Sequence, residues 1–250
     1  MTSQTARQTE CVTHFKALVM SSILIFAFIG YSLYMAFRKQ RPAQSSKPPV
    51  SRSHASGDVG EARVCTELDR VLSWLCGDDY YVHPTALLLN HAPGTDFATA
   101  EVDHLVIAPF GIFVVETKHW AARIAPGSDA TTLLCHLPGG RLEERRSPLN
   151  QNRSKVAFLR SMLPAMWDVH GVGVFSSDVC TLSPALPIDL IRASDLGHWL
   201  REKKNRHALS GRPSIKVKLA RDAIRHLSVD DPTGAAIEIH RRKIQQSLPI

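Results

Sequence analysis

An uncharged apolar segment near the N-terminus is the strongest constraint on how this 250-residue chain can be organised. Residues 17–37 (ALVMSSILIFAFIGYSLYMAF) contain no charged side chain. As a helix they would extend about 31 Å, which matches the hydrocarbon core of a bilayer. A cleavable signal peptide has a shorter apolar core and a small-residue cleavage site, which this segment lacks, and a buried helix of this length is rarely apolar on every face. We therefore predict one N-terminal transmembrane helix that is not removed.

The charges on the two sides of this segment predict its orientation. Arg7 and Lys16 precede it. Five basic residues follow it closely: Arg38, Lys39, Arg41, Lys47 and Arg52. The positive-inside rule then places the rest of the chain in the cytoplasm, which agrees with five cysteines that form no CxxC pair. We expect a single-pass protein of a bacterial inner membrane, with residues 1–16 outside and the Pro- and Ser-rich residues 38–56 as a basic, flexible linker.

The formal net charge of +7 does not by itself indicate a nucleic-acid-binding core. Residues 57–200 contain 11 basic and 17 acidic side chains, whereas residues 201–250 contain 12 basic and 5 acidic ones. The basic excess therefore lies at the two ends of the chain. A basic C-terminal extension can bind nucleic acid or a bilayer surface, or it can simply be solvated.

Residues 57–200 have the helix and strand patterns of an α/β domain. An apolar stripe at helical spacing predicts a first helix that begins near Gly60, and it consists of Val64, Leu68, Val71, Leu72 and Leu75. Glu61 lies at the end of this stripe, where a carboxylate is costly unless a cation meets it, although the helix dipole also favours a first-turn glutamate. The patterns further predict a strand over 80–90, a loop over 91–99, strands over 101–107 and 112–118, a helix over 150–166, a strand over 171–177, a strand leading into a helix near Ser194, and a basic amphipathic helix after residue 200.

The strands at 101–107 and 112–118 are predicted to form a hairpin around the Pro-Phe-Gly turn. If residues 107 and 112 pair, Asp103 lies opposite Glu116 and Glu101 lies opposite Lys118. These four charged residues would share one face with Leu105, Ile107, Ile112 and Val114, and the other face would hold Val102, Val106, Phe113 and Val115.

Two carboxylates directly across a hairpin repel each other, so a positive group is expected between Asp103 and Glu116. Lys118 can neutralise part of the charge, and Mg²⁺ or Mn²⁺ can neutralise the rest, because carboxylate and carbonyl oxygens suit these ions. The alternative is a solvated polar rim on a half-exposed sheet. His104 and His119 alternate to the opposite face, so we interpret them as structural residues.

Three motifs resemble the NERD (nuclease-related) domain of the PD-(D/E)XK nuclease superfamily: GE at 60–61, EVDHLVIAPFGIFVVETKHW at 101–120 and SPLNQN at 147–152. The resemblance implies an α/β fold, with a mixed central β-sheet flanked by helices on both faces as in restriction endonucleases, and the site at one edge. It also implies phosphodiester hydrolysis, with Mg²⁺ or Mn²⁺ as cofactor and nucleic acid as partner. DNA is the leading expectation for that partner, and the sequence does not distinguish it from RNA. Two positions depart from the family pattern: Ser147 replaces asparagine, and Lys155 stands where related nucleases often have an aromatic residue.

The resemblance also assigns roles to individual residues. Metal ligands would be Asp103, Glu116, the backbone carbonyl of Thr117 and Glu61. Lys118 would orient or deprotonate the attacking water or stabilise charge on phosphorus, and Gln151 would position phosphate or water. Arg153, Lys155 and Arg160 offer phosphate contacts, or they form a solvated helical face.

Three classes of function follow from these observations. The first is a membrane-anchored, divalent-metal-dependent nuclease. The second is a catalytically silent, anchored module of the same fold that binds nucleic acid or a protein. The third is a membrane-assembly protein that works through its transmembrane helix.

Overall fold

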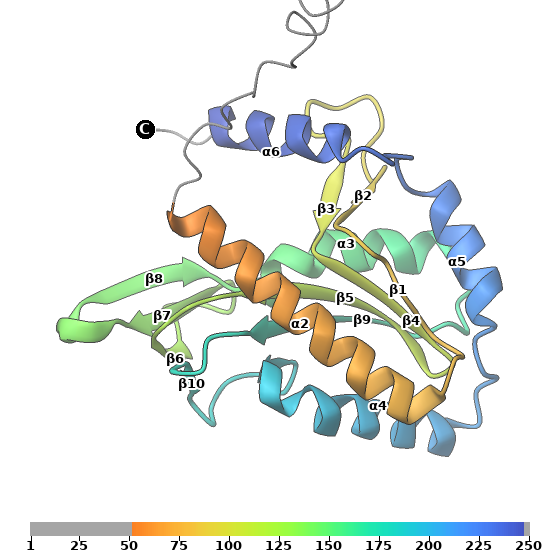
Figure 1. The fold of residues 1–250 in the computed structure, drawn as a ribbon, viewed down its shortest axis with the longest axis horizontal. Coiled ribbons are helices and arrows are strands. Elements are labelled where there is room, and N and C mark those ends of the chain that lie inside the picture. Colours follow the sequence, from red (N-terminus) through yellow and green to blue (C-terminus); the bar gives the residue numbers. More distant parts are fainter. Residues whose placement is uncertain (1–51, 248–250) are drawn as a thin grey trace, which may run out of the picture. The chain divides into compact units, whose positions relative to one another are not determined.

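A five-stranded mixed sheet lies at the centre of the domain, with strand order β1-β4-β5-β9-β11 (Figure 1). The computed structural model describes residues 52–247, with side chains from residue 57. The strands are β1 (Tyr81–Val82), β4 (His104–Ala108), β5 (Gly111–Lys118), β9 (Val169–Phe175) and β11 (Leu190–Arg192). Strands β1, β4 and β5 are antiparallel neighbours, whereas β5, β9 and β11 run parallel.

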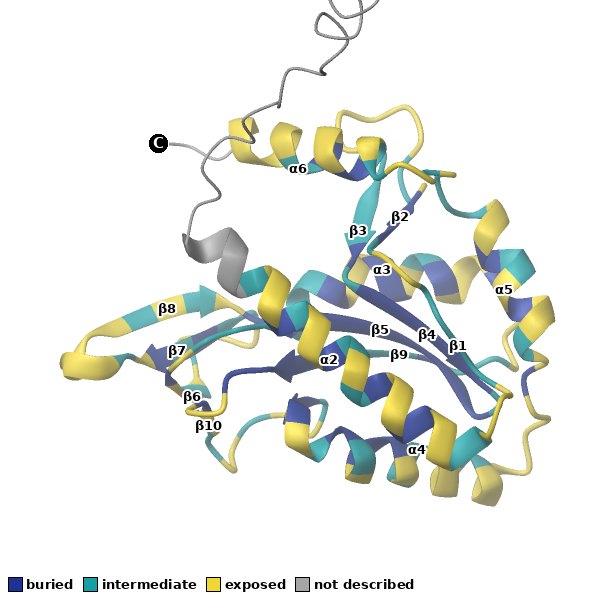
Figure 2. Cartoon of the chain, in the orientation of Figure 1, coloured by how far each residue is buried: buried dark blue, intermediate teal, exposed yellow. Residues whose placement is uncertain are grey.

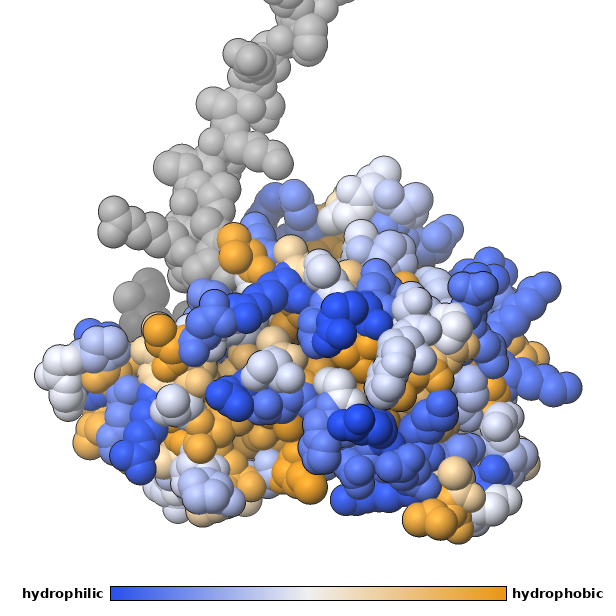
Figure 3. All heavy atoms as spheres, turned by 60° about the horizontal axis from the view of Figure 1, so that its bottom comes forward, coloured by the Kyte–Doolittle hydropathy of each residue, from blue (hydrophilic) through white to orange (hydrophobic). Residues whose placement is uncertain are grey.

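Helices cover both faces of this sheet, as the family resemblance implies. Helices α2 (Arg52–Cys76) and α4 (Leu196–Ser210) pack on one face, and α3 (Pro148–Met162) and α5 (Val217–His226) pack on the other. Figure 2 shows β4, β5 and β9 buried along most of their length, while the helices expose their outer sides. From the α4 side, hydrophilic side chains cover much of the surface and apolar side chains lie between them (Figure 3). The predicted mixed α/β architecture is confirmed.

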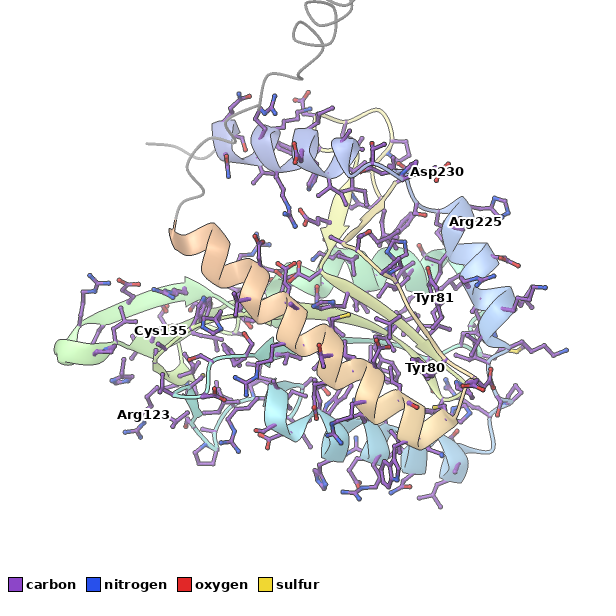
Figure 4. All side chains as sticks on the ribbon, viewed as in Figure 1. Tyr80, Tyr81, Arg123, Cys135, Arg225 and Asp230 are labelled. Carbon is purple, nitrogen blue, oxygen red and sulfur yellow. The ribbon has the colours of Figure 1, made fainter. Side chains whose placement is uncertain are left out.

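Three strands of a smaller four-stranded sheet lie within residues 121–146, where the sequence predicts no strands, and the fourth comes from residues 181–182. This sheet contains β6 (Arg123–Pro126), β7 (Thr132–His136), β8 (Leu142–Arg146) and β10 (Thr181–Leu182), in the order β10-β6-β7-β8. Arg123 and Cys135 mark its β6 and β7 strands in Figure 4. A two-stranded pair, β2 (Leu87–Leu89) with β3 (Ala100–Val102), and a last helix α6 (Ala235–Ser247) complete the described chain.

The first helix begins at Arg52, so the predicted start near Gly60 is wrong. Its apolar stripe is confirmed, because Val64, Leu68, Val71 and Leu72 are buried against the sheet and Leu75 packs beside them. The predicted anchor at 17–37 lies outside the described residues. Within residues 52–247, no helix is both long enough and apolar enough to cross a bilayer.

The predicted hairpin register is confirmed along β4 and β5, where Leu105 pairs with Val114 and Ile107 with Ile112. It is wrong before His104, because the chain bends at Asp103 and the preceding residues form β3. Glu101 therefore lies opposite Leu88 on β2 and not opposite Lys118.

The bend also changes the packing of the residue before it. The sequence places Val102 on the face of Val106, but Val102 packs in the other core cluster, with Leu105 and Ile107. Alternation along a strand holds only while the strand continues, and β4 does not extend past His104.

Candidate active site

The carboxyl end of β5 is where the charged residues of the domain converge. β5 is the middle strand of the central sheet, so Glu116, Thr117 and Lys118 lie at the end of that strand rather than on an edge strand of the sheet. β4 has already ended on this side, which leaves the backbone of Thr117 without a ladder partner there. Asp103, at the bend, takes that place: its Oδ2 accepts a hydrogen bond from the Thr117 backbone N–H at 2.8 Å.

Glu116 is a buried carboxylate held by two lysines. Its Oε1 is 2.8 Å from Lys118 Nζ, and its Oε2 is 2.7 Å from Lys155 Nζ. The Glu116 side chain is only 8% exposed. Burial alone would raise its pKa, but Lys155 and Lys118 outweigh burial and hold the pKa below its ordinary value. Glu116 is therefore ionised at neutral pH.

Asp103 has the opposite electrostatic environment. Burial, followed by repulsion from Glu116, raises the pKa of Asp103 to about 7. Its Oδ1 makes no hydrogen bond to any of the residues 57–247. Among residues 57–247, Glu116 therefore pairs with two cations, whereas Asp103 makes no ion pair.

Helix α3 supplies Lys155 and Gln151 because it packs closely across β5 and β9. Asn152 is buried and donates from Nδ2 to the carbonyl oxygens of Val114 on β5 and Val172 on β9, at 2.9 and 3.2 Å. Gly173 lies directly beside Glu116 in the sheet. A Cβ at Gly173 would lie 2.6 Å from Pro148 Cβ, so only glycine lets the first turn of α3 approach here.

Helix α2 brings Glu61 to the same place through a close contact at Gly60. A Cβ at Gly60 would lie 2.6 Å from Ser176 Oγ and 3.1 Å from His119 Cβ. The glycine thus allows α2 to lie against the ends of β5 and β9. Burial raises the pKa of Glu61, and Arg241 opposes that rise.

These residues line one cavity of about 830 Å³. Seven predicted site residues meet there: Glu61, Asp103, Glu116, Thr117, Lys118, Gln151 and Lys155. A second cavity of about 670 Å³ lies at the other end of the domain, around Tyr81, Arg225 and Asp230 (Figure 4). None of the site residues predicted from the sequence lines this second cavity.

The structure corrects the surface interpretation of helix α3. Lys155 is buried and paired with Glu116, so it does not belong to a solvated face. Arg153 is exposed and does not line the cavity. Arg160 donates from Nε to the carbonyl oxygen of Val169 at 3.0 Å, which gives it a structural contact at the far end of the helix.

His104 and His119, which lie next to the carboxylates in sequence, differ in their burial and in their contacts. His104 is buried, and burial lowers its pKa to about 4, so it is neutral at physiological pH. His119 lies within 3.0 Å of Ser176 Oγ through its Nδ1 and also lines the cavity. The structural role predicted for His104 agrees with its burial. The position predicted for His119 is wrong, because His119 lines the cavity beside the carboxylates and does not lie on the opposite face.

Sequence reasoning missed Arg241 as a residue of this cavity. It lies on α6 and makes an ion pair with Glu101. Only its position in a run of basic residues (HRRK) marks it, and such runs are usually solvated.

The oxygens at this site suit a magnesium or manganese ion. Mg²⁺ commonly takes one or two carboxylates and keeps several waters, and Asp103 with Glu116 provides two. Thr117 adds its carbonyl, because the C=O of a strand residue points to the same side as its N–H, here toward Asp103. Among residues 57–247, no three His, Cys, Asp or Glu side chains cluster as a metal-binding group. The oxygen atoms available here are of the type that Mg²⁺ and Mn²⁺ prefer, whereas zinc is most often bound by Cys and His.

A comparison with models of protein families finds a match within this chain. The model of the family described as "Nuclease-related domain" (NERD) matches residues 56–176. This segment includes Glu61, Asp103, Glu116, Lys118 and Gln151. Comparisons with curated proteins and with solved structures give no match. The resemblance predicted from the hairpin and the SPLNQN motif is confirmed, because residues 56–176 match the nuclease-related domain (NERD) model, which is consistent with a NERD domain protein.

Proposed function

We propose that this domain is a divalent-metal-dependent nuclease that hydrolyses phosphodiester bonds, with DNA as its substrate. The observation that supports the proposal most strongly is the convergence of Asp103, Glu116 and Lys118 at the end of β5, in a cavity of about 830 Å³. The match to the nuclease-related family gives independent support for nuclease-related chemistry.

The metal would be held by Asp103, Glu116 and the carbonyl oxygen of Thr117, with Glu61 as a further carboxylate. When bound, the ion supplies Lewis-acid polarisation of the scissile phosphate and a bound water of lowered pKa. For Glu116 to become a ligand, one of its two lysines has to release an oxygen. Lys118 is the more mobile of the two, because its side chain is 20% exposed and that of Lys155 only 9%.

Lys118 then acts on the substrate from the same strand. Its Nζ, no longer confined to Glu116 Oε1, donates hydrogen bonds to a non-bridging phosphate oxygen, where negative charge grows in the transition state. Gln151 lines the cavity beside it and orients the phosphate through its side-chain amide. Lys155 stays on Glu116 and keeps that carboxylate ionised.

Replacing Lys118 by methionine is expected to lower kcat for DNA cleavage by about 10²–10³-fold with little change in KM. The reason is that the ammonium group acts on charge present only in the transition state. The measurement is steady-state cleavage of linear DNA, and of RNA in parallel, by the purified full-length chain in detergent with Mg²⁺.

A matched control is Lys218→Met, which removes an exposed lysine of α5 that does not line the cavity. It is expected to leave kcat unchanged. Equal activity of Lys118→Met and the parent chain would exclude the role given to Lys118, and preference for RNA would correct the substrate.

We further propose that residues 17–37 anchor the nuclease domain to a bacterial inner membrane, with the domain in the cytoplasm. The support comes from the uncharged apolar segment and the excess of basic residues after it. Removing residues 1–37 is expected to move the chain from the sedimented membrane fraction to the supernatant. Retention of the shortened chain in the membrane fraction would refute the anchor.

One observation favours the alternative of a catalytically silent binding module. Both oxygens of Glu116 are bound by lysines, so the domain holds its own cations where a metal would bind. In that case DNA would be retained in a salt-dependent manner without cleavage in any metal. Incubation with supercoiled plasmid in Mg²⁺, in Mn²⁺ and in EDTA separates the two functions.

A further inference from the structure

Helix α6 forms part of the cavity wall although it lies well beyond the matched residues 56–176. Three contacts hold it in place. His240, which is buried, lies within 2.9 Å of Thr99 Oγ1 through its Nδ1. Lys243 donates to the carbonyl oxygen of Asp96, and its Nζ lies 5.6 Å from the centre of the Phe97 ring. These contacts fix the helix on the loop before β3, and the ion pair of Arg241 with Glu101 ties it to β3 itself.

Arg241 is a residue of α6 that lines the cavity near Glu61, Asp103 and Glu116, the carboxylates that we call the acidic floor. Its Nε lies 2.9 and 3.1 Å from the two carboxylate oxygens of Glu101, and its Nη2 also donates to Glu101. No hydrogen bond among residues 57–247 uses its Nη1. The Arg241 side chain is 39% exposed, whereas Glu101 is 16% exposed. The guanidinium is thus held on one side and open to the cavity on the other.

The carboxylates in this cavity make a cation necessary wherever a negatively charged phosphodiester backbone is to bind. The floor contains Glu61, Asp103 and Glu116 beside Lys118 and Lys155, and both lysines are already paired with Glu116. Glu61 and an ionised Asp103 would therefore repel a phosphodiester backbone. Basic residues stand at the rim: Arg145 and Arg146 come from β8 and Arg241 comes from α6. β8 and α6 are separate elements that lie apart in the fold (Figure 1), and each contributes residues to the cavity lining. A nucleic-acid strand over the floor would meet a cation from each.

We propose that α6 is a substrate-binding wall of the nuclease, in which Arg241 binds a backbone phosphate through Nη1 while Glu101 fixes the guanidinium. The proposal rests on the proposed function and extends it to the basic C-terminal extension. An arginine held by a carboxylate loses little conformational freedom when it meets a phosphate, and its planar fork suits phosphate oxygens. Such a contact positions the backbone and reads no sequence.

The test is DNA binding by the full-length chain in detergent, with EDTA present so that cleavage cannot occur. The probe is a short fluorescein-labelled DNA duplex, and the readout is fluorescence anisotropy over a range of salt concentrations. Arg241→Gln is expected to weaken binding about tenfold and to reduce the slope of log affinity against log salt by about one. Arg242→Gln is the matched control, because Arg242 has the same charge, is exposed and does not line the cavity. It is expected to change affinity less than about twofold.

A second variant separates phosphate binding from a structural role of the ion pair. Glu101→Gln combined with Arg241→Gln removes both charges, so no unpaired carboxylate remains and the fold is kept. This double variant is expected to bind as weakly as Arg241→Gln. Restored binding would show that Arg241 only neutralises Glu101, and equal losses in Arg241→Gln and Arg242→Gln would show a general charge effect. Either result, or no DNA binding by the parent chain, would overturn the proposal. Because EDTA removes catalysis from the assay, a chain that never cleaves DNA can still pass it.

Discussion

Replacing Asp103 by asparagine is expected to abolish metal-dependent cleavage and, at the same time, to stabilise the metal-free protein above pH 7. Burial and the neighbouring Glu116 raise the pKa of Asp103 from 3.8 to about 7. A carboxyl whose folded pKa is raised favours folding while protonated, so this contribution is full below about pH 4 and is lost as the pH rises through about 7. Asparagine cannot ionise, and its side-chain oxygen can still accept the Thr117 N–H. The expected gain at pH 8 is about 2–4 kcal/mol.

The measurement is urea unfolding in EDTA at pH 5 and pH 8. At pH 5 the difference between Asp103→Asn and the parent chain should be smaller. Asp78→Asn is the control, since Asp78 is exposed and makes no ion pair with another described residue. It should leave the free energy of unfolding unchanged at both pH values. Added Mg²⁺ should stabilise the parent chain and not Asp103→Asn. A loss of stability at pH 8 in the variant would contradict the charge repulsion described here.

Replacing Lys155 by methionine is expected to destabilise the domain by about 3 kcal/mol. The substitution leaves the buried Glu116 carboxylate with Lys118 as its remaining cation, and an undercompensated buried charge is costly. Burial and repulsion from Glu116 raise the pKa of Asp103, and Lys155 partly opposes this rise. The substitution removes that opposing charge. The measurement is urea unfolding at pH 7 in EDTA.

A double-mutant cycle tests whether the ion pair causes this loss. Glu116→Gln with Lys155→Met removes both charges, and it should recover most of the lost stability because uncharged replacements of a buried pair are often neutral. Lys118→Met should cost less than Lys155→Met, since Lys118 is more exposed and its removal leaves the better-buried pair intact. If the double variant is no more stable than Lys155→Met, packing and not charge explains the effect.

Local patterns predicted the elements that build the floor of the site. The apolar stripe of α2 and the register of β4 with β5 are both confirmed, because residues close in sequence determine them. The acidic pattern of the hairpin also brought Asp103 and Glu116 together correctly, although through the Thr117 N–H and not as a ladder pair.

What the sequence did not predict depends on contacts between distant segments. The bend at Asp103 lies where the chain leaves β3, which pairs with β2, and enters β4, and no residue in EVDHLVI marks it. Lys155 had the appearance of a surface lysine, because its burial follows from the close packing of α3 at Gly173. Arg241 is separated from Glu101 by 140 positions, and only the fold brings α6 to β3.

The small sheet was missed for a different reason. Strand β8 (LEERR) is mostly charged, and its alternation of exposed and half-buried residues does not resemble a buried strand. Its two half-buried residues are Glu143 and Arg145, which pair with each other, and the Arg145 guanidinium lies over the Trp120 ring, 5.0 Å from its centre. Charged strands of this kind give little apolar signal in a sequence.

The central claim is that Asp103 and Glu116 form a metal-dependent centre for phosphodiester hydrolysis. The most direct measurement is incubation of the purified full-length chain with supercoiled plasmid in Mg²⁺, in Mn²⁺ and in EDTA, beside Glu116→Gln that is shown to be folded. We expect the parent chain to give nicked or linear plasmid with either metal and intact plasmid in EDTA. The variant should leave the plasmid intact in every condition. Cleavage that persists in EDTA or in Glu116→Gln, or no cleavage by the folded parent chain in any metal, would contradict the central claim.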